Sequence, residues 1–418
     1  MPSMAQFDHH SPEFAENWRA IYREARAGGC PVVHSDLYDG YDVLLKHADV
    51  KEAFRDYESF ASERLRDDDD IELDGGVGIP EHPFRIGFLE MDPPDSLSLR
   101  RIVNPWFSPR TIAAGRPRID EAVTWAVDQV IERGECDLIT DLASPFQCMV
   151  VLDLLGIPLD RWKAYKEVID KEVAQEDDAI EGIQWILGDL FDEVVQQREH
   201  GGEGLIAQLA VAEVDGVGIE DDLTAELVLM LLLGGMDTTI ATIGHAISHL
   251  DTHRDDRQRL MDDPSIMATA VEEILRFYSP ATAMARTVRK PVTIAGKAYE
   301  RGDRVLCAIA SANQDEDAFA DAHVMDITRS PNPHLTFGTG THRCIGMDLA
   351  RVNTELFLNA VLARMGDYEV LRDQVKIHDS IPHANGFTSM PMRFTKGEPS
   401  RPSDGTFPTF SAPRILPV

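Results

Sequence analysis

Residues 337–346 read Phe337-Gly338-Thr339-Gly340-Thr341-His342-Arg343-Cys344-Ile345-Gly346. The glycines let this backbone turn tightly and approach a flat partner closely, because they carry no Cβ. Cys344 begins an apolar-periodic run that predicts a helix, and a thiol at a helix N-terminus faces unpaired N–H groups that favour its thiolate. Gly346 just inside that helix lowers its stability, which is best explained if something bulky lies against it.

The lone cysteine narrows the chemistry of this loop. With no second cysteine nearby, Cys344 cannot build a tetrahedral zinc site or an iron–sulfur cluster, whereas a haem iron can use one thiolate as its fifth ligand. The alternative is a glycine-rich loop around a buried structural cysteine. The decapeptide resembles the Phe-x-x-Gly-x-x-x-Cys-x-Gly haem-binding loop of the cytochrome P-450 family, the haem-thiolate monooxygenases. The resemblance implies haem b (iron protoporphyrin IX), with Cys344 as its axial iron ligand and Phe337, Gly338 and Gly346 beside it.

Length and composition bound the class of protein. The chain has 418 residues, 43% of them hydrophobic, so it can bury a large core. Its five cysteines are scattered and odd in number, which argues for a reducing compartment rather than a disulfide framework. The N-terminus is polar and the longest apolar stretch, Leu227 to Met236, is short, so we expect a soluble cytoplasmic protein without a membrane span. A net charge of −32 repels nucleic acid and anionic lipid.

Helical patterns dominate the chain, with short strands near both ends. Strands are expected within Pro31–Leu44 and Val292–Ile309, where apolar residues alternate between turn signals. A long helix is expected to run from the capping candidates Asp221 and Asp222 to about Thr252. The pattern therefore predicts a mainly α protein with minor β (α+β).

The chain reads as one domain with a tail. Residues 63–83 are acidic and glycine-rich and predict an irregular loop, in which the run Asp67 to Asp70 is solvated. The domain is expected to cover residues 1–398, and residues 399–418 are expected to form an extended, proline-rich surface tail. The resemblance implies a single large triangular fold, with haem between a long oxygen-binding helix and the helix that follows the cysteine.

The middle of the long helix breaks the rules of helix propensity. Leu231-Leu232-Leu233-Gly234-Gly235-Met236-Asp237-Thr238-Thr239 contains two glycines, which cost about 1 kcal/mol each against alanine, and two β-branched threonines. Such a break is expected at a functional site, because glycines let a flat cofactor lie against the backbone and a hydroxyl can engage an i−4 carbonyl. The alternative is a core helix with a buried, satisfied threonine.

This stretch resembles the Ala/Gly-Gly-x-Asp/Glu-Thr motif of the family's oxygen-binding helix. On that match Gly234 and Gly235 would lie against the cofactor. Thr238 would hold activated oxygen in a hydrogen bond, and Asp237 would relay protons to it.

Glu273 and Arg276 lie three residues apart and therefore share one helix face. Alone, such a pair is most often a surface ion pair that contributes little to stability. About seventy residues before the cysteine it resembles the family's Glu-x-x-Arg motif. The resemblance implies a buried structural ion network, with Arg329 or His334 as the third member.

Haem carries two propionates, and buried anions need cationic donors. Three residues match family positions for this task, namely Arg100, Arg286 and His342. The family usually has a His four residues before the first arginine, whereas this chain has Ser96. That propionate contact is therefore either lost or replaced by Ser96 or water. Taken singly, each arginine is more often a solvated surface residue.

The resemblance implies reductive activation of dioxygen and hydroxylation of a C–H bond. The Cys344 thiolate would push electron density onto the iron and favour O–O cleavage. The chain has no flavin or nicotinamide fingerprint, so we expect electrons from NAD(P)H through a reductase and a 2Fe–2S ferredoxin (or flavodoxin). A monomer with a basic patch that steers an acidic donor is expected. The candidate patch residues are Arg100, Arg101, Arg110, Arg116, Arg118, Arg343 and Arg351.

The substrate pocket is expected to be apolar with few polar groups. By family position it would be lined by Met230, Leu231, Gly234, Ala281, Thr282, Met284, Phe387 and Thr388. Such a lining indicates a hydrophobic small molecule: a terpenoid, a steroid, a fatty acid or an alkylated aromatic.

Three other functions compete with this interpretation. A haem-thiolate enzyme could use peroxide directly, or isomerise or reduce a small molecule, but the retained Asp237 and Thr238 argue for O₂ activation. A non-catalytic haem sensor normally carries an output module, and no second domain is visible. A helical binding protein without haem would leave the glycines at 234, 235 and 346 unexplained.

Overall fold

The computed structural model describes residues 6–29, 32–66, 72–174, 176, 178–381, 384–401, 408 and 410–417. The expected acidic loop Asp67 to Asp70 lies outside these residues. Helices dominate the described chain, which confirms the prediction of a mainly α protein with minor β. The helices are α1 (Pro12–Ala27), α2 (His47–Arg55), α3 (Asp95–Val103), α4 (Pro109–Asp128), α5 (Ser144–Leu155), α6 (Trp162–Val173), α7 (Ala179–His200), α8 (Leu205–Ala210), α9 (Asp221–Thr252), α10 (Arg254–Asp262), α11 (Met267–Tyr278), α12 (Ile309–Ala312) and α13 (Met347–Arg364).

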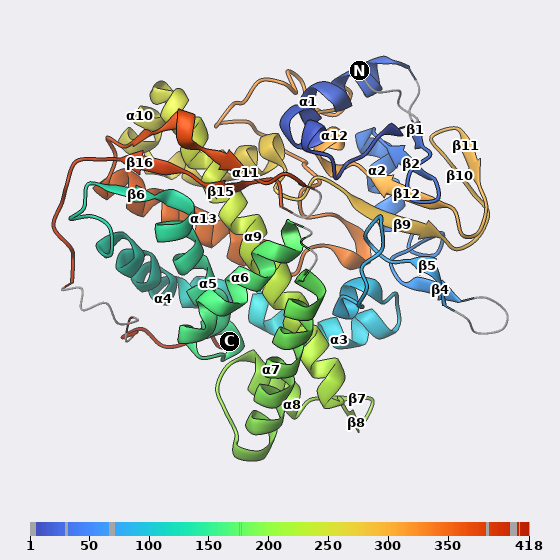
Figure 1. Cartoon of the computed structure of the whole chain (residues 1–418), viewed down its shortest axis with the longest axis horizontal. Helices are drawn as coiled ribbons and strands as arrows, with labels where there is room; N and C mark the ends of the chain where they lie inside the picture. The colour runs from blue at the N-terminus through green and yellow to red at the C-terminus, as the bar shows by residue number, and fades with distance from the viewer. Residues whose placement is uncertain are drawn as a thin grey trace.

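The strands gather mainly on one side of the molecule (Figure 1). The largest sheet has the order β1-β2-β12-β9-β3, in which β12 runs parallel to β2 and the other pairs are antiparallel. Its strands are β1 (Val32–Ser35), β2 (Tyr41–Leu44), β3 (Phe60–Ala61), β9 (Met284–Val288) and β12 (Arg304–Cys307).

Smaller sheets and short helical turns complete the described fold. A three-stranded sheet has the order β13-β16-β6, and four two-stranded hairpins or pairs surround the helices. Their strands are β4 (Arg64–Arg66), β5 (Glu72–Gly75), β6 (Glu135–Asp137), β7 (Glu213–Val214), β8 (Val217–Gly218), β10 (Val292–Ile294), β11 (Lys297–Tyr299), β13 (Glu369–Val370), β14 (Lys376–Ile377), β15 (Phe387–Ser389) and β16 (Pro391–Arg393). The turns are η2 (Gly87–Glu90), η3 (Asn104–Phe107), η4 (Leu138–Ala143, π-helical), η5 (Leu159–Arg161), η6 (Pro264–Ile266), η7 (Gly340–His342) and η8 (Arg372–Gln374). The hairpin β4–β5 corrects the expectation of a wholly irregular loop over residues 63–83.

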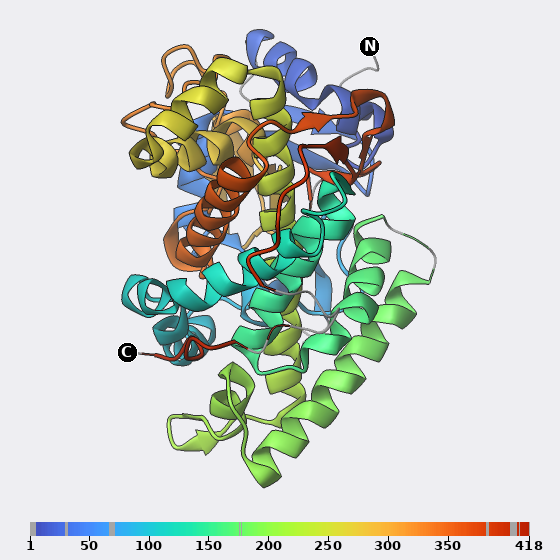
Figure 2. The same cartoon turned by 90° about the vertical axis from the view of Figure 1, so that its left-hand side faces the viewer.

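The long helix α9 crosses the middle of the molecule and packs against α5, α7 and α13 (Figures 1 and 2). It has the predicted length, but its N-cap residue is Glu220 rather than Asp221 or Asp222. Those two aspartates lie in the first turn instead, where their charge favours the positive end of the helix dipole. Because α9 packs against α5, α7 and α13, these helices are arranged around it.

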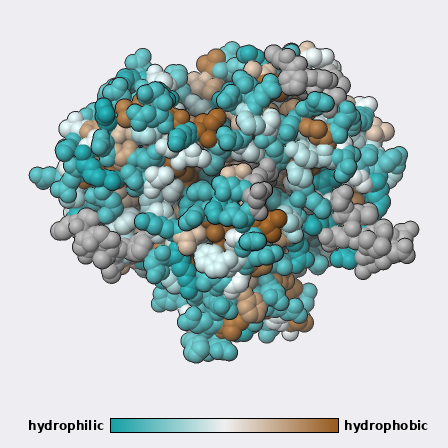
Figure 3. Space-filling model, in the orientation of Figure 1, coloured by the Kyte–Doolittle hydropathy of each residue, from teal (hydrophilic) through white to brown (hydrophobic). Residues whose placement is uncertain are grey.

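Two helical stretches are long and apolar enough to cross a membrane by composition, Leu138–Leu155 and Asp221–Thr252. Inside the protein, 89% and 72% of their apolar windows are buried, as expected for core helices. The face seen in Figure 3 is mostly hydrophilic, with scattered apolar residues. The apolar character of these two helical stretches is thus explained by their packing within the fold.

The C-terminal tail is anchored more firmly than an extended surface chain. Ile415 is only 3% exposed and belongs to the main core cluster. A Cβ at Gly115 of α4 would lie 2.5 Å from Ile415 Cγ1, so the small residue leaves the notch that Ile415 fills. Arg118 also donates a hydrogen bond to the Ala412 carbonyl at 2.6 Å. The described part of the tail therefore packs against α4.

A buried ion network connects α11 to the segment that leads into the cysteine loop. Glu273 and Arg276 are both fully buried, and two nitrogens of Arg276 donate to the Glu273 carboxylate at 2.7 Å. Arg329 Nε donates to both oxygens of that carboxylate at 3.1 Å. His334 instead bonds Glu272 at 3.1 Å. Of the two partners expected for Glu273, the structure thus places Arg329 there and His334 on the neighbouring carboxylate.

The same arginine also fixes the backbone. Arg276 Nη1 donates to the carbonyls of Asn313 and Ala322, each at 2.8 Å. Removing one member of a buried ion pair strands its partner's charge and costs about 3–5 kcal/mol. The position of residues 313–334, and with it the approach to the cysteine loop, depends on this network.

Substitution of Glu273 tests that dependence. We expect Glu273→Gln to lower the free energy of unfolding of the haem-loaded protein by about 3–5 kcal/mol, because two buried guanidinium groups lose their counter-ion. The matched control is Glu272→Gln at the next position, which should cost less, about 1–2 kcal/mol, because its partner Arg351 is partly exposed and also contacts Asp348. Urea unfolding measures both, and equal losses would contradict the structural role of Glu273.

Candidate active site

The cysteine loop is held by backbone contacts that only glycine permits. Cys344 N donates to the Phe337 carbonyl at 2.8 Å, which closes the loop into a tight turn. Gly340 has φ +76°, and a Cβ there would lie 2.6 Å from the Phe54 carbonyl at the end of α2. The loop can therefore rest on α2 only with glycine at this position.

Gly346 lies differently from its expected place. It is the N-cap residue of α13, which begins at Met347, so it does not interrupt the helix. A Cβ on Gly346 or Gly338 would meet no heavy atom within 4 Å. Open space therefore adjoins the loop on both sides of Cys344.

The Cys344 thiol opens onto that space. Burial raises its pKa, although the Gly346 N–H and the guanidinium groups of Arg100, Arg351 and Arg343 act in the opposite direction. Yet Cys344 is solvent-accessible, unlike Cys136, Cys148 and Cys307, which are buried. A side chain that is surrounded by protein and still accessible faces a hollow inside the molecule. Coordination of a metal would deprotonate such a thiol outright.

The centre of α9 also presents open space. A Cβ on Gly234 would meet no heavy atom within 4 Å, and Gly234 is exposed in a helix whose neighbouring turns are buried. The Thr238 hydroxyl donates to the Gly234 carbonyl at 3.1 Å. Gln147 of α5 donates to the Gly235 carbonyl at 2.6 Å. The helix thus keeps its course while two of its carbonyls are engaged by side chains.

Asp237 is buried beside Thr238 and forms an ion pair that the sequence did not indicate. Its Oδ1 lies 3.1 Å from the Lys166 Nζ of α6, and Lys166 also contacts Asp170. Burial lowers the pKa of Lys166, but the charges of Asp237 and Asp170 outweigh it and raise the pKa overall. No described residue donates to the second oxygen, Asp237 Oδ2. Lys166 lies 71 positions before Asp237, and no local pattern connects the two.

The residues expected to hold haem propionates form a cationic, donor-rich corner. Arg286 is buried and stacks on Phe54 at 4.9 Å, and Arg100 stacks on Phe88 at 5.3 Å and donates to the Arg343 carbonyl at 2.6 Å. Neither guanidinium has a carboxylate ion-pair partner among the described residues. Burial lowers the pKa of both. A buried cation, Arg286, and a half-buried one, Arg100, with no carboxylate ion pair among the described residues favour an anionic ligand.

Three buried polar atoms in the same region lack a partner among the described residues. They are Ser96 Oγ, Thr341 Oγ1 and His342 Nδ1. Buried polar atoms are normally hydrogen-bonded, so such a cluster indicates a polar ligand. Together with Arg100 and Arg286, these atoms could bind a group that carries two negative charges, such as the two propionates of haem. The accessible Cys344 thiol could bind the iron of the same group. The residues present therefore fit haem.

His342 is oriented by an aspartate that sequence reasoning missed. His342 Nε2 donates to Asp92 Oδ1 at 3.0 Å, and Asp92 Oδ2 accepts from Arg289 at 2.5 Å and from the Ser62 N–H at 3.1 Å. Burial raises the pKa of Asp92, but these contacts outweigh it and lower the pKa. The Asp92-Pro93-Pro94 turn can be recognised in the sequence as the start of α3. The sequence does not indicate that Asp92 contacts His342, because the two residues are 250 positions apart.

The expected pocket residues fall into two groups. Met230 and Leu231 lie on the buried face of α9, and Met230 packs against Gly87 of η2. Ala281 and Met284 are partly buried, and Thr388 is exposed. Thr282 and Phe387, in contrast, are packed into the protein. Thr282 donates to the Ile381 carbonyl at 3.1 Å, and Phe387 meets the His245 ring edge-on with centroids 4.9 Å apart.

The expected basic patch is smaller than the sequence suggested. Arg116 pairs with Glu355, Arg118 with Asp153, and Arg351 with Glu272, so their charges are already compensated. Arg100 points inward, as described above. Arg101, Arg110 and Arg343 remain exposed, with no ion pair to a described residue.

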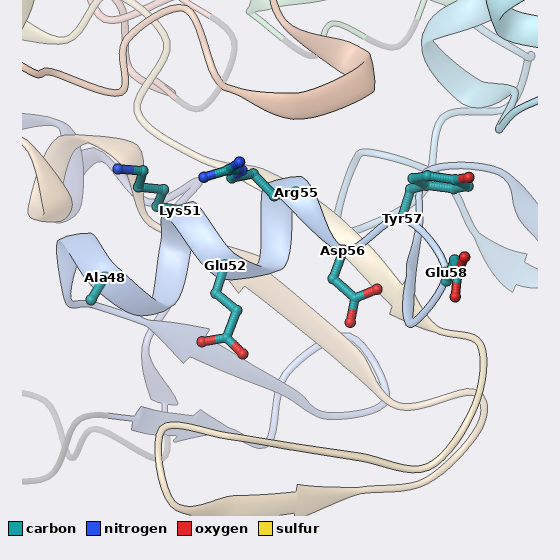
Figure 4. Close-up of a pocket in the computed structure, with 7 residues that line it drawn as sticks. All are labelled: Ala48, Lys51, Glu52, Arg55, Asp56, Tyr57 and Glu58. Carbon is teal, nitrogen blue, oxygen red and sulfur yellow. The ribbon is translucent and has the colours of Figure 1, made fainter.

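A separate surface pocket of about 630 Å³ lies along α2 (Figure 4). Glu52, Asp56 and Glu58 line it together with Lys51 and Arg55. None of the residues expected at the haem or substrate lies in it. This pocket is therefore distinct from the hollow at Cys344.

Comparisons with known proteins agree with this geometry. The family model "Cytochrome P450" matches residues 262–392, which include the ion network and the cysteine loop. The chain is 32% identical to a steroid C26-monooxygenase of Mycobacterium tuberculosis over 337 residues, or 78% of this chain and 90% of the relative.

Solved structures extend the similarity to nearly the whole chain. A mutant of P450 EryK in complex with erythromycin B has a TM-score of 0.81 at 28% identity, covering 96% of this chain and all of that one. CYP109E1 from Bacillus megaterium in complex with testosterone has a TM-score of 0.82 at 25% identity, covering 92% and 99%. With the accessible Cys344 thiol, the cationic corner and the interrupted centre of α9, these similarities establish that the chain is a member of the cytochrome P450 family of haem-thiolate monooxygenases.

Proposed function

We propose that this monooxygenase hydroxylates a hydrophobic small molecule, using haem b, dioxygen and electrons that pass from NAD(P)H through a reductase and a 2Fe–2S ferredoxin (or flavodoxin). The observation that carries the proposal is the pairing of an accessible, lone Cys344 with open space at Gly234 and the Thr238–Asp237 step of α9. Cys344 would supply a single thiolate ligand, and Asp237 and Thr238 would supply proton donors for oxygen chemistry. When bound, the haem supplies the redox-active iron.

Each residue has a role that follows from its surroundings. Cys344 would bind the iron, and the propionates would neutralise Arg100 and Arg286, with the hydroxyls of Ser96 and Thr341 as further donors. Because His342 Nε2 already donates to Asp92, His342 would donate from Nδ1 to a propionate as an imidazolium. Gly234 and Gly235 permit close approach to the α9 backbone. The Thr238 hydroxyl can exchange its bond to the Gly234 carbonyl for a bond to oxygen on the open side. Asp237, held by Lys166, would pass protons to Thr238.

The relatives support a hydrophobic substrate. One curated relative is a steroid C26-monooxygenase, and one solved neighbour holds testosterone. Met230 and Leu231 would supply an apolar wall on α9, and Ala281 and Met284 would line the pocket by family position. A steroid or terpenoid of similar size is therefore the first class to screen.

The electron source is tested by comparing two assays on the same protein. Turnover of a screened compound with ferredoxin, reductase and NAD(P)H is expected to exceed turnover with hydrogen peroxide alone. Turnover with peroxide alone, and none with the reductase system, would replace the proposal with a peroxygenase.

Thr238→Ala tests the proton path. We expect the variant to keep its haem and to bind the screened compound, while product formed per NAD(P)H falls at least about tenfold and peroxide release rises, because the hydroxyl no longer donates to oxygen. Thr242→Ala is the matched control, since its buried hydroxyl bonds the Thr238 carbonyl at 2.8 Å one turn along α9. Undiminished coupling in Thr238→Ala would refute the role of this hydroxyl.

Charge reversal tests the docking of the electron donor. Arg101→Glu with Arg110→Glu is expected to slow reduction by ferredoxin at low salt by about tenfold or more and to flatten its salt dependence, because the patch would no longer attract an acidic partner. Arg23→Glu, an exposed change on α1, serves as the control. Stopped-flow reduction under CO measures the rate, and an unchanged rate and salt slope in the double variant would exclude this patch.

A further inference from the structure

A charged cluster lies where α6 crosses α9, beside the open turn of α9 at Gly234. It consists of Lys166, Asp170 and Glu172 of α6 and Asp237 of α9, and it is bordered by His82 and His378. Lys166 occupies the centre, in contact with Asp237 Oδ1 and Asp170. The cluster is therefore continuous with the residue that we expect to serve oxygen chemistry.

The two α6 carboxylates differ in exposure: Glu172 is largely enclosed, whereas Asp170 is open to solvent. Burial raises the pKa of Asp170 and of Glu172, and the nearby charge of Asp237 adds to this effect at Glu172, whose pKa reaches about 7. The side chains of Asp170 and Glu172 are 48% and 19% exposed. Glu172 is thus surrounded by protein and still partly accessible, as Cys344 is.

The cluster is short of positive charge. Three carboxylates face one ammonium group, and Lys166 already contacts two of them. Glu172 accepts no hydrogen bond from the described residues, and the ring atom His82 Nδ1 lies 3.8 Å from Glu172 Oε1, beyond hydrogen-bond distance. Burial lowers the pKa of His378 and so favours its neutral form. Asp237 Oδ2, more than nine-tenths buried, also lacks a donor.

A ligand bound beside this cluster must donate hydrogen bonds to Glu172 and to Asp237 Oδ2, or supply positive charge. A neutral apolar molecule that displaced water would leave buried carboxylate oxygens without donors, and an anion would be repelled by them. A divalent metal is not indicated, because the described residues contain no cluster with metal-ligand geometry. A protonated amine provides both the charge and the N–H donors. The surroundings of the cluster are apolar, since Ile169 and Val173 of α6 and Met230 of α9 are buried core residues, and this suits a hydrophobic remainder.

We infer that the substrate is a hydrophobic molecule that carries a basic amine, whose ammonium group is seated between Glu172 and the free oxygen of Asp237. This inference rests on the proposed function and narrows its substrate class. It sets aside fatty acids, which bring a carboxylate. Glu172 is the residue that determines this preference, while Asp237 serves both the substrate and oxygen.

The test uses three probes of one chain length on the purified haem-loaded protein. N,N-dimethyldodecylamine is cationic at pH 7.5, dodecan-1-ol is neutral and dodecanoate is anionic. Equilibrium dialysis gives their affinities without requiring a spin-state change. We expect the amine to bind at least about tenfold more tightly than the alcohol, and dodecanoate to bind most weakly.

A variant on α6 locates the preference. Glu172→Gln keeps the shape of the side chain, and it should lower amine affinity about tenfold while changing alcohol affinity less than about twofold. Glu167→Gln, an exposed change on the same helix, should alter neither. If the wild-type protein binds the amine no more tightly than the alcohol, or if Glu172→Gln binds it as well as the wild type, the inference is wrong.

The reduced CO spectrum of the same samples separates this outcome from a failure of the proposed function. A thiolate-type spectrum without amine preference overturns the amine inference alone. A spectrum without thiolate ligation overturns the proposed function, whatever the probes do.

Discussion

The structure depends on keeping one thiol at a fixed point inside the protein while leaving it accessible. Burial opposes the thiolate of Cys344, so the fold supplies compensation through the Gly346 N–H and nearby guanidinium groups. The loop itself is braced from two directions, by the α2 backbone under Gly340 and by the buried network of Glu273, Arg276 and Arg329. The bracing residues come from segments far apart in the sequence, such as Phe54 and Gly340, which explains why so large a domain surrounds one ligand atom.

The second constraint acts on α9. A helix that is apolar on nearly all sides would pack everywhere, but its centre carries Gly234, Asp237 and Thr238 and so stays open on one side. Asp237 is buried on this helix, and its two carboxylate oxygens need hydrogen-bond donors. Lys166 forms an ion pair with one of these oxygens. The same shortage extends to Glu172, so oxygen chemistry and substrate selection share one electrostatic environment.

The sequence predicts the elements of this site far better than their partners. The cysteine loop, the centre of α9 and the Glu273–Arg276 pair were predictable because each is encoded within ten residues. Long-range pairs were not, since no local pattern relates Asp92 to His342, Lys166 to Asp237 or Arg116 to Glu355. For that reason the expected basic patch was too large and the acidic excess around Glu172 was not anticipated. The anchoring of Ile415 in the notch at Gly115 was missed likewise.

The proposed chemistry depends on Cys344 binding haem iron as a thiolate. The most direct measurement is the absorption spectrum of the dithionite-reduced protein under carbon monoxide, compared between wild type and Cys344→Ala. We predict a Soret band shifted far to the red in the wild type and no such band in the variant. An unshifted band in the wild type, or a protein that takes up no haem, would contradict it.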